Sequence, residues 1–315
     1  MSLAGHVWTL AANLRHRLAP HRPPAHEPWE HTLADPQHGP VRLTGALHRV
    51  GSDVLCVVVH GLGGGVDSHY VVRAAVAVTA AGLDCLRLGL RGSDRRGEDF
   101  YHAGLVADLD AALQSPALAA YRTIYALGYS VGGHLTLRWA LTPSDPRVKA
   151  VASVCAPLDL AAGCSAIDGP GVAVYRDHVL AGLKQIYAAV AARRAVPTPW
   201  ATVRRLTTIR AWDRHAVVPR HGFCSVDDYY ARVSVGPRLG RLALPALVVS
   251  APADPMVPAA SVIAPHVARL PAHVLHRWTD RGGHVAFPRA VRLDLDLPQT
   301  PGLEGQVLAW LRLHA

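Results

Sequence analysis

Lysine is nearly absent from this 315-residue chain, in which only Lys149 and Lys184 occur among 32 basic residues. The five cysteines are odd in number, widely spaced and without a CxxC pair, so nothing calls for a disulfide framework or an oxidising compartment. No uncharged apolar run of about 18 residues occurs, so no membrane-spanning helix is expected. At 50% hydrophobic and 17% charged residues, the composition excludes disorder and is typical of a globular protein.

The net charge is +9, and +8 of it falls between Arg176 and Arg241. No zinc-finger, RNP or helix-turn-helix pattern accompanies this charge, so we expect no nucleic-acid partner. Two interpretations of the basic segment stay open: weak association with an anionic membrane surface or acidic substrate, or an ordinary solvated surface. The amphipathic N-terminus lacks the parts of a signal peptide, which leads us to expect a cytoplasmic protein.

Short apolar runs alternate with segments of helical period along most of the chain. This alternation predicts an α/β fold whose mostly parallel central sheet carries helices on both faces. The expected strands are 54–59, 84–90, 123–127, 148–155, 246–250 and 273–278, and the expected helices are 68–82, 102–113, 131–141, about 261–270 and 302–313.

The alternation stops between Pro157 and Leu244, where the chain is helical in pattern, basic and punctuated by proline. One sheet interrupted by an insertion explains this better than two separate domains. We therefore expect an N-terminal arm over 1–40, a core over 41–156 and 245–315, and a helical lid over 157–244.

Gly128-Tyr129-Ser130-Val131-Gly132 lies between a predicted strand and a predicted helix. A serine on such a sharp turn is lifted clear of the sheet and placed at a helix N-terminus, where developing negative charge is stabilised. The pattern predicts a nucleophile elbow with Ser130 as the nucleophile. A serine here is unlike epoxide hydrolases and haloalkane dehalogenases, which place an aspartate at this position.

A serine hydroxyl needs a base, and the base needs an orienting acid. In the chain order of an α/β-hydrolase, both follow the serine on loops beyond later strands. Asp254 follows the strand 246–250 and His284 follows the strand 273–278. Because both loops fall at the carboxyl ends of parallel strands, we expect Ser130, Asp254 and His284 to meet as a catalytic triad.

His60-Gly61-Leu62-Gly63-Gly64-Gly65 directly follows a buried strand. In this fold, one oxyanion-hole N–H comes from the residue after the nucleophile, here Val131, and the other from this loop, here Leu62. A phosphate cradle is the competing interpretation, but no GxGxxG or GKS/T pattern is present. No HExxH or CxxC pattern occurs either, so we expect no metal.

Further motifs accompany these residues from about Gly5 to Phe287. Together they resemble the YheT-like family of α/β-hydrolases, within the AB hydrolase 4 family. The matching stretches are HGLxG with a later Ser/Tyr pair (Gly61 to Tyr70), Arg91-Gly92, Y-H-x-G with an aspartate (Tyr101 to Asp108), GYSxGG (Gly128 to His134), Ser153 to Pro157, Asp228 to Tyr230, Asp254-Pro255 and GGHxxF (Gly282 to Phe287).

The resemblance implies esterases or lipases that act on carboxylic esters through a Ser-His-Asp triad without a cofactor. It departs at His134, Ala253 and Ala286, where the family pattern has Asn, Asp and Gly, and these departures bear on pocket shape. Residues expected to bind substrate or support the site are His60, Gly61, Tyr129, Arg91, His102 and Asp108. We expect Arg91, His102 and Asp108 to form a buried polar network, and Trp212, Asp213 and the stretch 228–230 to pack within the lid.

The function predicted from the sequence is hydrolysis of short- to medium-chain acyl esters or acylglycerol-like lipids. One alternative is acyl transfer to an alcohol by the same triad. The other is a non-catalytic ligand-binding hydrolase fold, which usually loses a triad residue, whereas this chain keeps all three. The partner expected is therefore a small-molecule or lipid ester; the sequence does not determine the oligomeric state.

Overall fold

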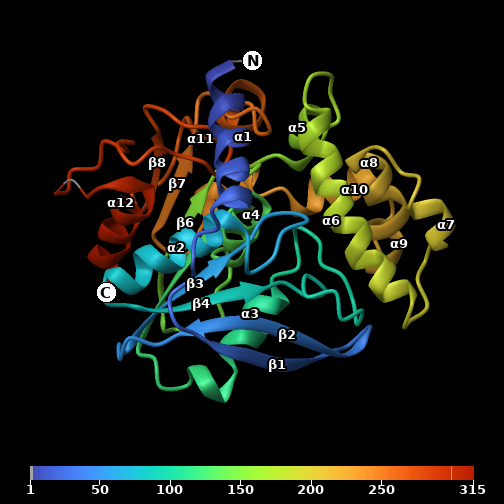
Figure 1. The fold of residues 1–315 in the computed structure, drawn as a ribbon, viewed down its shortest axis with the longest axis horizontal. Helices are drawn as coiled ribbons and strands as arrows, with labels where there is room; N and C mark the ends of the chain where they lie inside the picture. The colour runs from blue at the N-terminus through green and yellow to red at the C-terminus, as the bar shows by residue number, and fades with distance from the viewer. Residues whose placement is uncertain (1–2, 299) are drawn as a thin grey trace.

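Within residues 3–298 and 300–315, which the computed structural model describes, eight strands form one central sheet (Figure 1). Their order is β1-β2-β4-β3-β5-β6-β7-β8; β2 is antiparallel to β1 and β4, and all other pairs are parallel. The strands are β1 (Glu27–Asp35), β2 (Gly39–His48), β3 (Val54–Val59), β4 (Asp84–Gly89), β5 (Thr123–Tyr129), β6 (Val148–Val154), β7 (Ala246–Ser250) and β8 (Val274–Trp278).

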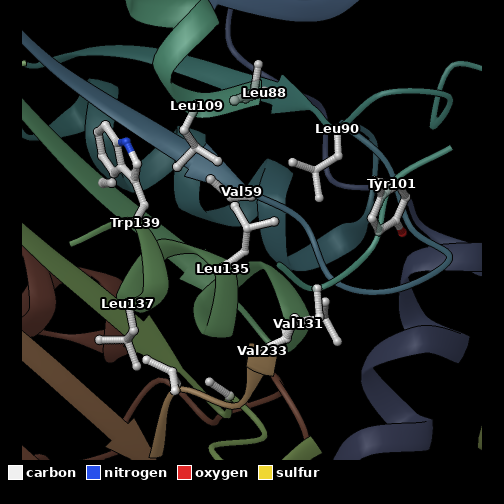
Figure 2. Packing of buried hydrophobic residues seen from close by; sticks show 14 of the residues in the cluster. Val59, Leu88, Leu90, Tyr101, Leu109, Val131, Leu135, Leu137, Trp139 and Val233 are labelled. Atoms are coloured by element: carbon white, nitrogen blue, oxygen red, sulfur yellow. The ribbon is translucent and has the colours of Figure 1, made fainter. Parts of the chain in front are cut away.

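Helices cover both faces of this sheet, as the alternating pattern predicts. Helices α2 (His69–Ala80) and α12 (Gly302–Leu311) pack on one face, and α3 (Ala107–Leu113) and α4 (Val131–Trp139) pack on the other. Figure 2 shows the second interface, where side chains of α3 and α4 meet those of β3 and β4. Strands β3 to β7 are buried on both faces over most of their length, which explains their continuous apolar runs, whereas the edge strand β8 is only partly buried.

The insertion between β6 and β7 forms a helical cap, whose helices run from yellow-green (α5, α6) to amber (α8 to α10) in Figure 1. Its apolar side chains belong to the same core cluster as those of α3 and α4, so the cap lies over that face of the sheet. Its elements are α5 (Leu160–Ile167), α6 (Ala173–Ala191), α7 (Trp200–Val203), α8 (Ile209–Trp212), the π-helix η2 (Asp213–Val217), α9 (Val218–His221), α10 (Val226–Val233) and the 3-10 helix η3 (Gly236–Arg241).

The structure corrects the expectation that residues 1–40 form an arm lying outside the sheet. Residues 3–18 form helix α1 (Leu3–Leu18), but β1 and the start of β2 belong to the sheet as an antiparallel hairpin. Because β1 is an edge strand with only Trp29 buried, its alternation is weak, and the proline-rich stretch before it conceals the signal.

Two predicted helices are shorter than their apolar patterns. Helix α3 begins at Ala107 instead of His102, after a turn that ends at Gly104. The helix expected near 261–270 is a π-helix, η4 (Ala259–Ile263), followed by the single turn α11 (Ala264–Val267), which has Pro265 near its start. The remaining short 3-10 helices are η1 (Pro116–Leu118) and η5 (Arg312–His314). Among the described residues, no helix combines the length and apolar character needed to cross a bilayer.

Candidate active site

The turn between β5 and α4 holds Ser130 in a strained backbone conformation, with φ 54° and ψ −126°. Close packing makes this turn possible, because a Cβ on Gly132 would overlap the backbone carbonyls of Val59 and His60. The backbone N–H of Ser130 donates to the carbonyl of Val154 over 2.8 Å, and its carbonyl accepts from His134 within α4. The hydroxyl is therefore fixed at the carboxyl edge of the sheet.

The structure brings Ser130, His284 and Asp254 together. His284 Nε2 lies 3.0 Å from Ser130 Oγ, and His284 Nδ1 lies 2.8 Å from Asp254 Oδ2. His284 and Asp254 are 5% and 6% exposed, so little solvent competes for these hydrogen bonds. The other carboxylate oxygen of Asp254 accepts the N–H groups of Met256 and Val257, which fixes the carboxylate within its loop.

The loop after β3 lies against Ser130, since a Cβ on Gly61 would come 3.0 Å from the Ser130 Cβ. Tyrosine hydroxyls accept the N–H groups on either side of Leu62: Tyr70 accepts that of Gly61 and Tyr101 that of Gly63. By contrast, in the described part of the chain neither Leu62 nor Val131 donates its N–H to a protein acceptor. These are the two donors expected to form an oxyanion hole.

His60 supports the site from beneath instead of lining it. Its ring is fully buried, Nδ1 donates to the carbonyl of Gly61 over 2.8 Å, and Nε2 accepts the N–H of Leu90. Burial lowers the pKa of His60 to about 4, so the ring is neutral and holds one tautomer. It ties the loop after β3 to the end of β4.

Of the other predicted support residues, Arg91 and Asp108 meet and His102 lies apart. Arg91 is fully buried and forms ion pairs with Asp108, Asp99 and Asp35 at 2.7 to 3.0 Å. His102 makes no hydrogen bond to that group and instead lines the cavity above Ser130, so the expected three-residue network is wrong in this member. Tyr129 points to the opposite face of the sheet, where its hydroxyl lies 3.1 Å from a carboxylate oxygen of Glu304.

His134 is the departure from the family pattern with a clear structural role. Its ring nitrogens lie 2.7 Å from the carbonyl of Pro157 and 3.0 Å from that of Val233. Burial lowers the pKa of His134 to about 4, so the neutral ring carries one N–H, donates to one of these carbonyls and ties helix α4 to the cap. The other two departures, Ala253 and Ala286, lie on the loops that carry Asp254 and His284.

A cavity of about 700 Å³ opens above Ser130 between the core and the cap. Most of its lining is apolar and comes from both layers, which suits an acyl chain better than a charged ligand. Lining side chains include Leu62, Val131, Leu160, Val179, Trp212 and Tyr229.

Three aspartates, Asp67, Asp94 and Asp213, interrupt this apolar lining, and Asp213 is a buried one. Asp213, at the start of the π-helix η2, is 7% exposed, lines the cavity and accepts a hydrogen bond from the Tyr230 hydroxyl over 2.6 Å. Burial raises the pKa of Asp213 to about 7, since an ionised carboxylate is poorly solvated there. Trp212, Asp213 and Tyr230, expected only to pack within the lid, all face the cavity.

Sequence reasoning missed the contribution of α1. Thr9 Oγ1 accepts the backbone N–H of His284 over 2.9 Å and donates to the carbonyl of Gly5. A Cβ on Gly5 would overlap the carbonyl of Ala253, the residue before Asp254. Helix α1 therefore touches the loops of both Asp254 and His284. The spacing of Gly5 and Thr9 on one helix face was the available signal.

Cys155, Asp254 and His284 form a group whose potential metal-ligand atoms lie within 4.8 Å of one another. Burial raises the pKa of the Cys155 thiol well above its usual value, which disfavours the thiolate that a metal ion requires. The carboxylate and imidazole are also already hydrogen-bonded to each other. The chemistry of this group therefore fits the hydrogen-bonded arrangement with Ser130 better than a metal centre.

Comparison with known proteins gives relatives over most of the chain. Residues 55–177 match the family model described as the alpha/beta hydrolase fold. The chain is 30% identical over 297 residues to "Putative esterase YheT" of Escherichia coli (strain K12), covering 91% of this chain and 80% of that protein. It is 27% identical over 253 residues to the embryogenesis-associated protein EMB8 of Picea glauca, covering 76% of this chain and 54% of that protein.

Solved structures agree on the fold. The esterase Pf2001 of Pyrococcus furiosus superposes with a TM-score of 0.52 at 15% identity, covering 83% of this chain and 82% of that one. This likeness confirms the predicted α/β-hydrolase fold, and the relationship to the Escherichia coli protein confirms the resemblance drawn from the motifs. The chain belongs to the YheT-like family of α/β-hydrolases, a family with esterase-like members.

Proposed function

We propose that this protein hydrolyses carboxylic esters through Ser130, His284 and Asp254. His284 Nε2 accepts the hydroxyl proton as Ser130 Oγ attacks the ester carbonyl. The N–H groups of Leu62 and Val131 donate hydrogen bonds to the resulting oxyanion, and each such donor typically contributes about 3 kcal/mol to transition-state stabilisation. Asp254 holds the imidazole in the required tautomer and stabilises its cation.

The remaining steps reuse the same groups. His284 returns its proton to the leaving alcohol as the tetrahedral intermediate collapses to an acyl-enzyme on Ser130. A water molecule then gives a proton to His284 and attacks the acyl carbonyl, and the second tetrahedral intermediate releases the carboxylic acid. Ser130 recovers its proton from His284, so the cycle needs no cofactor.

The observation that carries this proposal is the continuous hydrogen-bonded line from Ser130 through His284 to Asp254, at 3.0 and 2.8 Å, beneath an apolar cavity. The cavity of about 700 Å³ supports short- to medium-chain acyl esters or acylglycerol-like lipids as substrates. A non-catalytic binder would need neither the strained serine nor the two N–H groups left without protein acceptors.

Replacing Ser130 with Ala tests the assignment. We expect kcat for p-nitrophenyl esters of graded chain length to fall about 10⁴- to 10⁶-fold with an unchanged melting temperature. Ser261→Ala, an exposed serine in η4, is the matched control and should keep full activity. Turnover that survives Ser130→Ala would refute the proposed nucleophile.

A fluorophosphonate probe and a competing alcohol separate the alternatives. Labelling of the protein with Ser130 but not of Ser130→Ala supports the hydrolase, whereas absence of both labelling and turnover supports a binding protein. Product analysis with added alcohol then distinguishes the enzymes. Free acid as the main product supports hydrolysis, and a new ester as the main product supports acyl transfer.

A further inference from the structure

Helix α1 presents an apolar stripe to solvent. Five aliphatic side chains recur at spacings of four, three, four and four residues, which places them on one face of a helix. All of them are exposed: Leu3 by 78%, Val7 by 55%, Leu10 by 43%, Leu14 by 59% and Leu18 by 78%. Five of the eleven large hydrophobic residues exposed among the described residues thus lie on this single stripe.

The opposite face of α1, which packs on the protein, is small and polar. Among the residues of α1 whose burial the structure describes, Gly5 and Thr9 are the buried ones, and they contact the loops of Ala253 and His284. His6 Nδ1 lies 2.8 Å from the hydroxyl of Tyr175 in the cap. A surface helix ordinarily turns its apolar face to the core. This helix does the reverse, so its outer face is suited to an apolar environment outside the protein.

The charge within the N-terminal segment itself is of one sign. Residues 1–26 contain three arginines and no acidic residue. Arg15 within α1 and Arg22 after its end are exposed, and Trp8 of α1 is 37% exposed. Leucines with a flanking tryptophan and arginines are the composition of helices that lie in the surface of an anionic bilayer.

The stripe lies next to the cavity mouth. Thr9 and His16, on the inner side of α1, line the cavity above Ser130. In Figure 1, α1 stands between the sheet region and the cap helices α5 and α6. A surface bound to the outside of α1 would therefore lie close to the entrance for substrate.

We propose that α1 docks this protein on an anionic membrane surface, with its leucine stripe in the lipid and its long axis in the membrane plane. A 16-residue helix is about 24 Å long and has a polar inner face fixed to the protein, so it lies on the bilayer instead of crossing it. Resting on the proposed esterase function, the inference makes membrane-dissolved lipid esters the substrate class.

A second copy of the chain is the other occupant to consider for the stripe. Stable protein interfaces use about 20–30 residues on each side, whereas the stripe offers five side chains on a helix of four to five turns. An anionic lipid surface also matches the excess of arginine, which a second copy with the same charge does not. These two observations favour the membrane.

Vesicle sedimentation tests the proposal with the full-length Ser130→Ala protein, which cannot consume the lipid under the proposed function. We expect binding to vesicles of phosphatidylcholine mixed with phosphatidylglycerol, weaker binding to phosphatidylcholine alone, and release by added salt. A Leu10→Gln/Leu14→Gln variant should bind at least about tenfold less, because two aliphatic side chains no longer enter the lipid. Arg15→Gln should weaken only the component that depends on anionic lipid.

The matched control is Val50→Gln/Val76→Gln, which alters two exposed aliphatic side chains elsewhere and should bind like the parent. Equal vesicle binding by the parent and the α1 variant, or no binding by either, would overturn the proposal. So would light scattering that shows a dimer in the parent and a monomer in the α1 variant, because a second copy would then cover the stripe.

Membrane docking can be tested separately from the proposed ester hydrolysis. With Ser130 present, the Leu10→Gln/Leu14→Gln variant should hydrolyse a water-soluble short-chain ester at the parent rate while losing most of its activity on vesicle-borne ester. Loss of activity on both substrates would count against a role limited to membrane docking. The result of vesicle binding with the Ser130→Ala protein does not depend on whether Ser130 is the nucleophile.

Discussion

The two halves of the candidate site are supported in different ways. Ser130 sits on a turn whose backbone packs inside the core, where Gly132 touches the backbone of Val59 and His60. Asp254 and His284 instead sit on loops beyond β7 and β8, and helix α1 contacts both loops from outside the sheet. The serine is therefore fixed by the structure that holds the core together, whereas its base and acid depend on the docking of a peripheral helix.

This difference separates stability from activity. Disturbing the serine turn forces apart strand and helix backbones in a close-packed interior, so the whole fold is destabilised. Disturbing α1 frees two loops but leaves both hydrophobic clusters of the sheet in place. Substitutions in the two regions should therefore have separable effects on stability and on activity.

Gly132→Ala should give the largest effect. The new Cβ would overlap backbone carbonyls of Val59 and His60, which cannot rotate away as a side chain can. We expect a loss of about 4 kcal/mol or more in the free energy of unfolding, most of the margin of a typical domain. Urea unfolding followed by circular dichroism measures it, and a loss below about 1 kcal/mol would contradict this account of the turn.

Gly5→Ala is the matched change in helix α1, which supports the loops of Asp254 and His284. Its Cβ would overlap the carbonyl of Ala253, but α1 can shift outward to relieve the clash. We expect the free energy of unfolding of the core to stay within about 1 kcal/mol of the parent. Ester turnover should fall about 10- to 100-fold, because misplacement of a catalytic loop by about 1 Å has effects of that size. If both glycine variants behaved alike, the two kinds of support would not be distinct.

The cap adds a pH dependence of its own through Asp213. The folded-state pKa of Asp213 is raised to about 7, so its protonated form stabilises the fold fully below about pH 4, and this contribution is lost as the pH rises through 7. Asp213→Asn should flatten the fall in the free energy of unfolding over that range. At pH 8 the variant should be more stable than the parent by about 2 kcal/mol. This is less than the ~4 kcal/mol that the full pKa shift corresponds to, because water enters the cavity. Melting temperatures at pH 4 to 8 test this; parallel curves for the two proteins would contradict it.

What the sequence predicted follows the same division. The serine turn is a local pattern. Neighbouring backbone leaves no room for a Cβ at Gly128 or Gly132, and the strand before Ser130 and the helix after it are predicted from the adjoining residues. Asp254 and His284 were placed by their order after strands, and the structure brings them to Ser130. Placing Asp254 and His284 needed only the rule that the carboxyl ends of parallel strands lie at the same edge of the sheet.

The parts not predicted depend on contacts between segments far apart in the chain. Thr9 meets His284 across 275 residues, and the spacing of Gly5 and Thr9 indicates a packed helix face without indicating which loop it packs on. The edge strand β1 buries only Trp29, so its alternation was too weak to recognise. His102 faces the cavity instead of Arg91 because the cap residue His221 packs against it with ring centroids 4.4 Å apart. Family motifs grouped these residues without specifying how they are arranged in space.

Thr9→Val gives the smallest effect and tests the contact between α1 and the base directly. Valine keeps the shape of threonine but leaves the buried N–H of His284 without an acceptor, at a cost of about 1–3 kcal/mol. Because that group belongs to the loop of the base, the penalty should appear as a displaced imidazole. We expect kcat to fall about tenfold with little change in KM for a short soluble ester.

Thr9→Ser separates positioning from packing in the same assay. Serine restores the hydrogen-bond acceptor and removes only a methyl group, so Thr9→Ser should recover most of the kcat lost in Thr9→Val. If the side chain served only packing, serine would not be expected to restore kcat. Rates equal to the parent in the valine variant would mean that the His284 loop holds its position without α1. Helix α1 would then serve the membrane contact alone, and the two halves of the site would differ in their location but not in how much they depend on the rest of the chain.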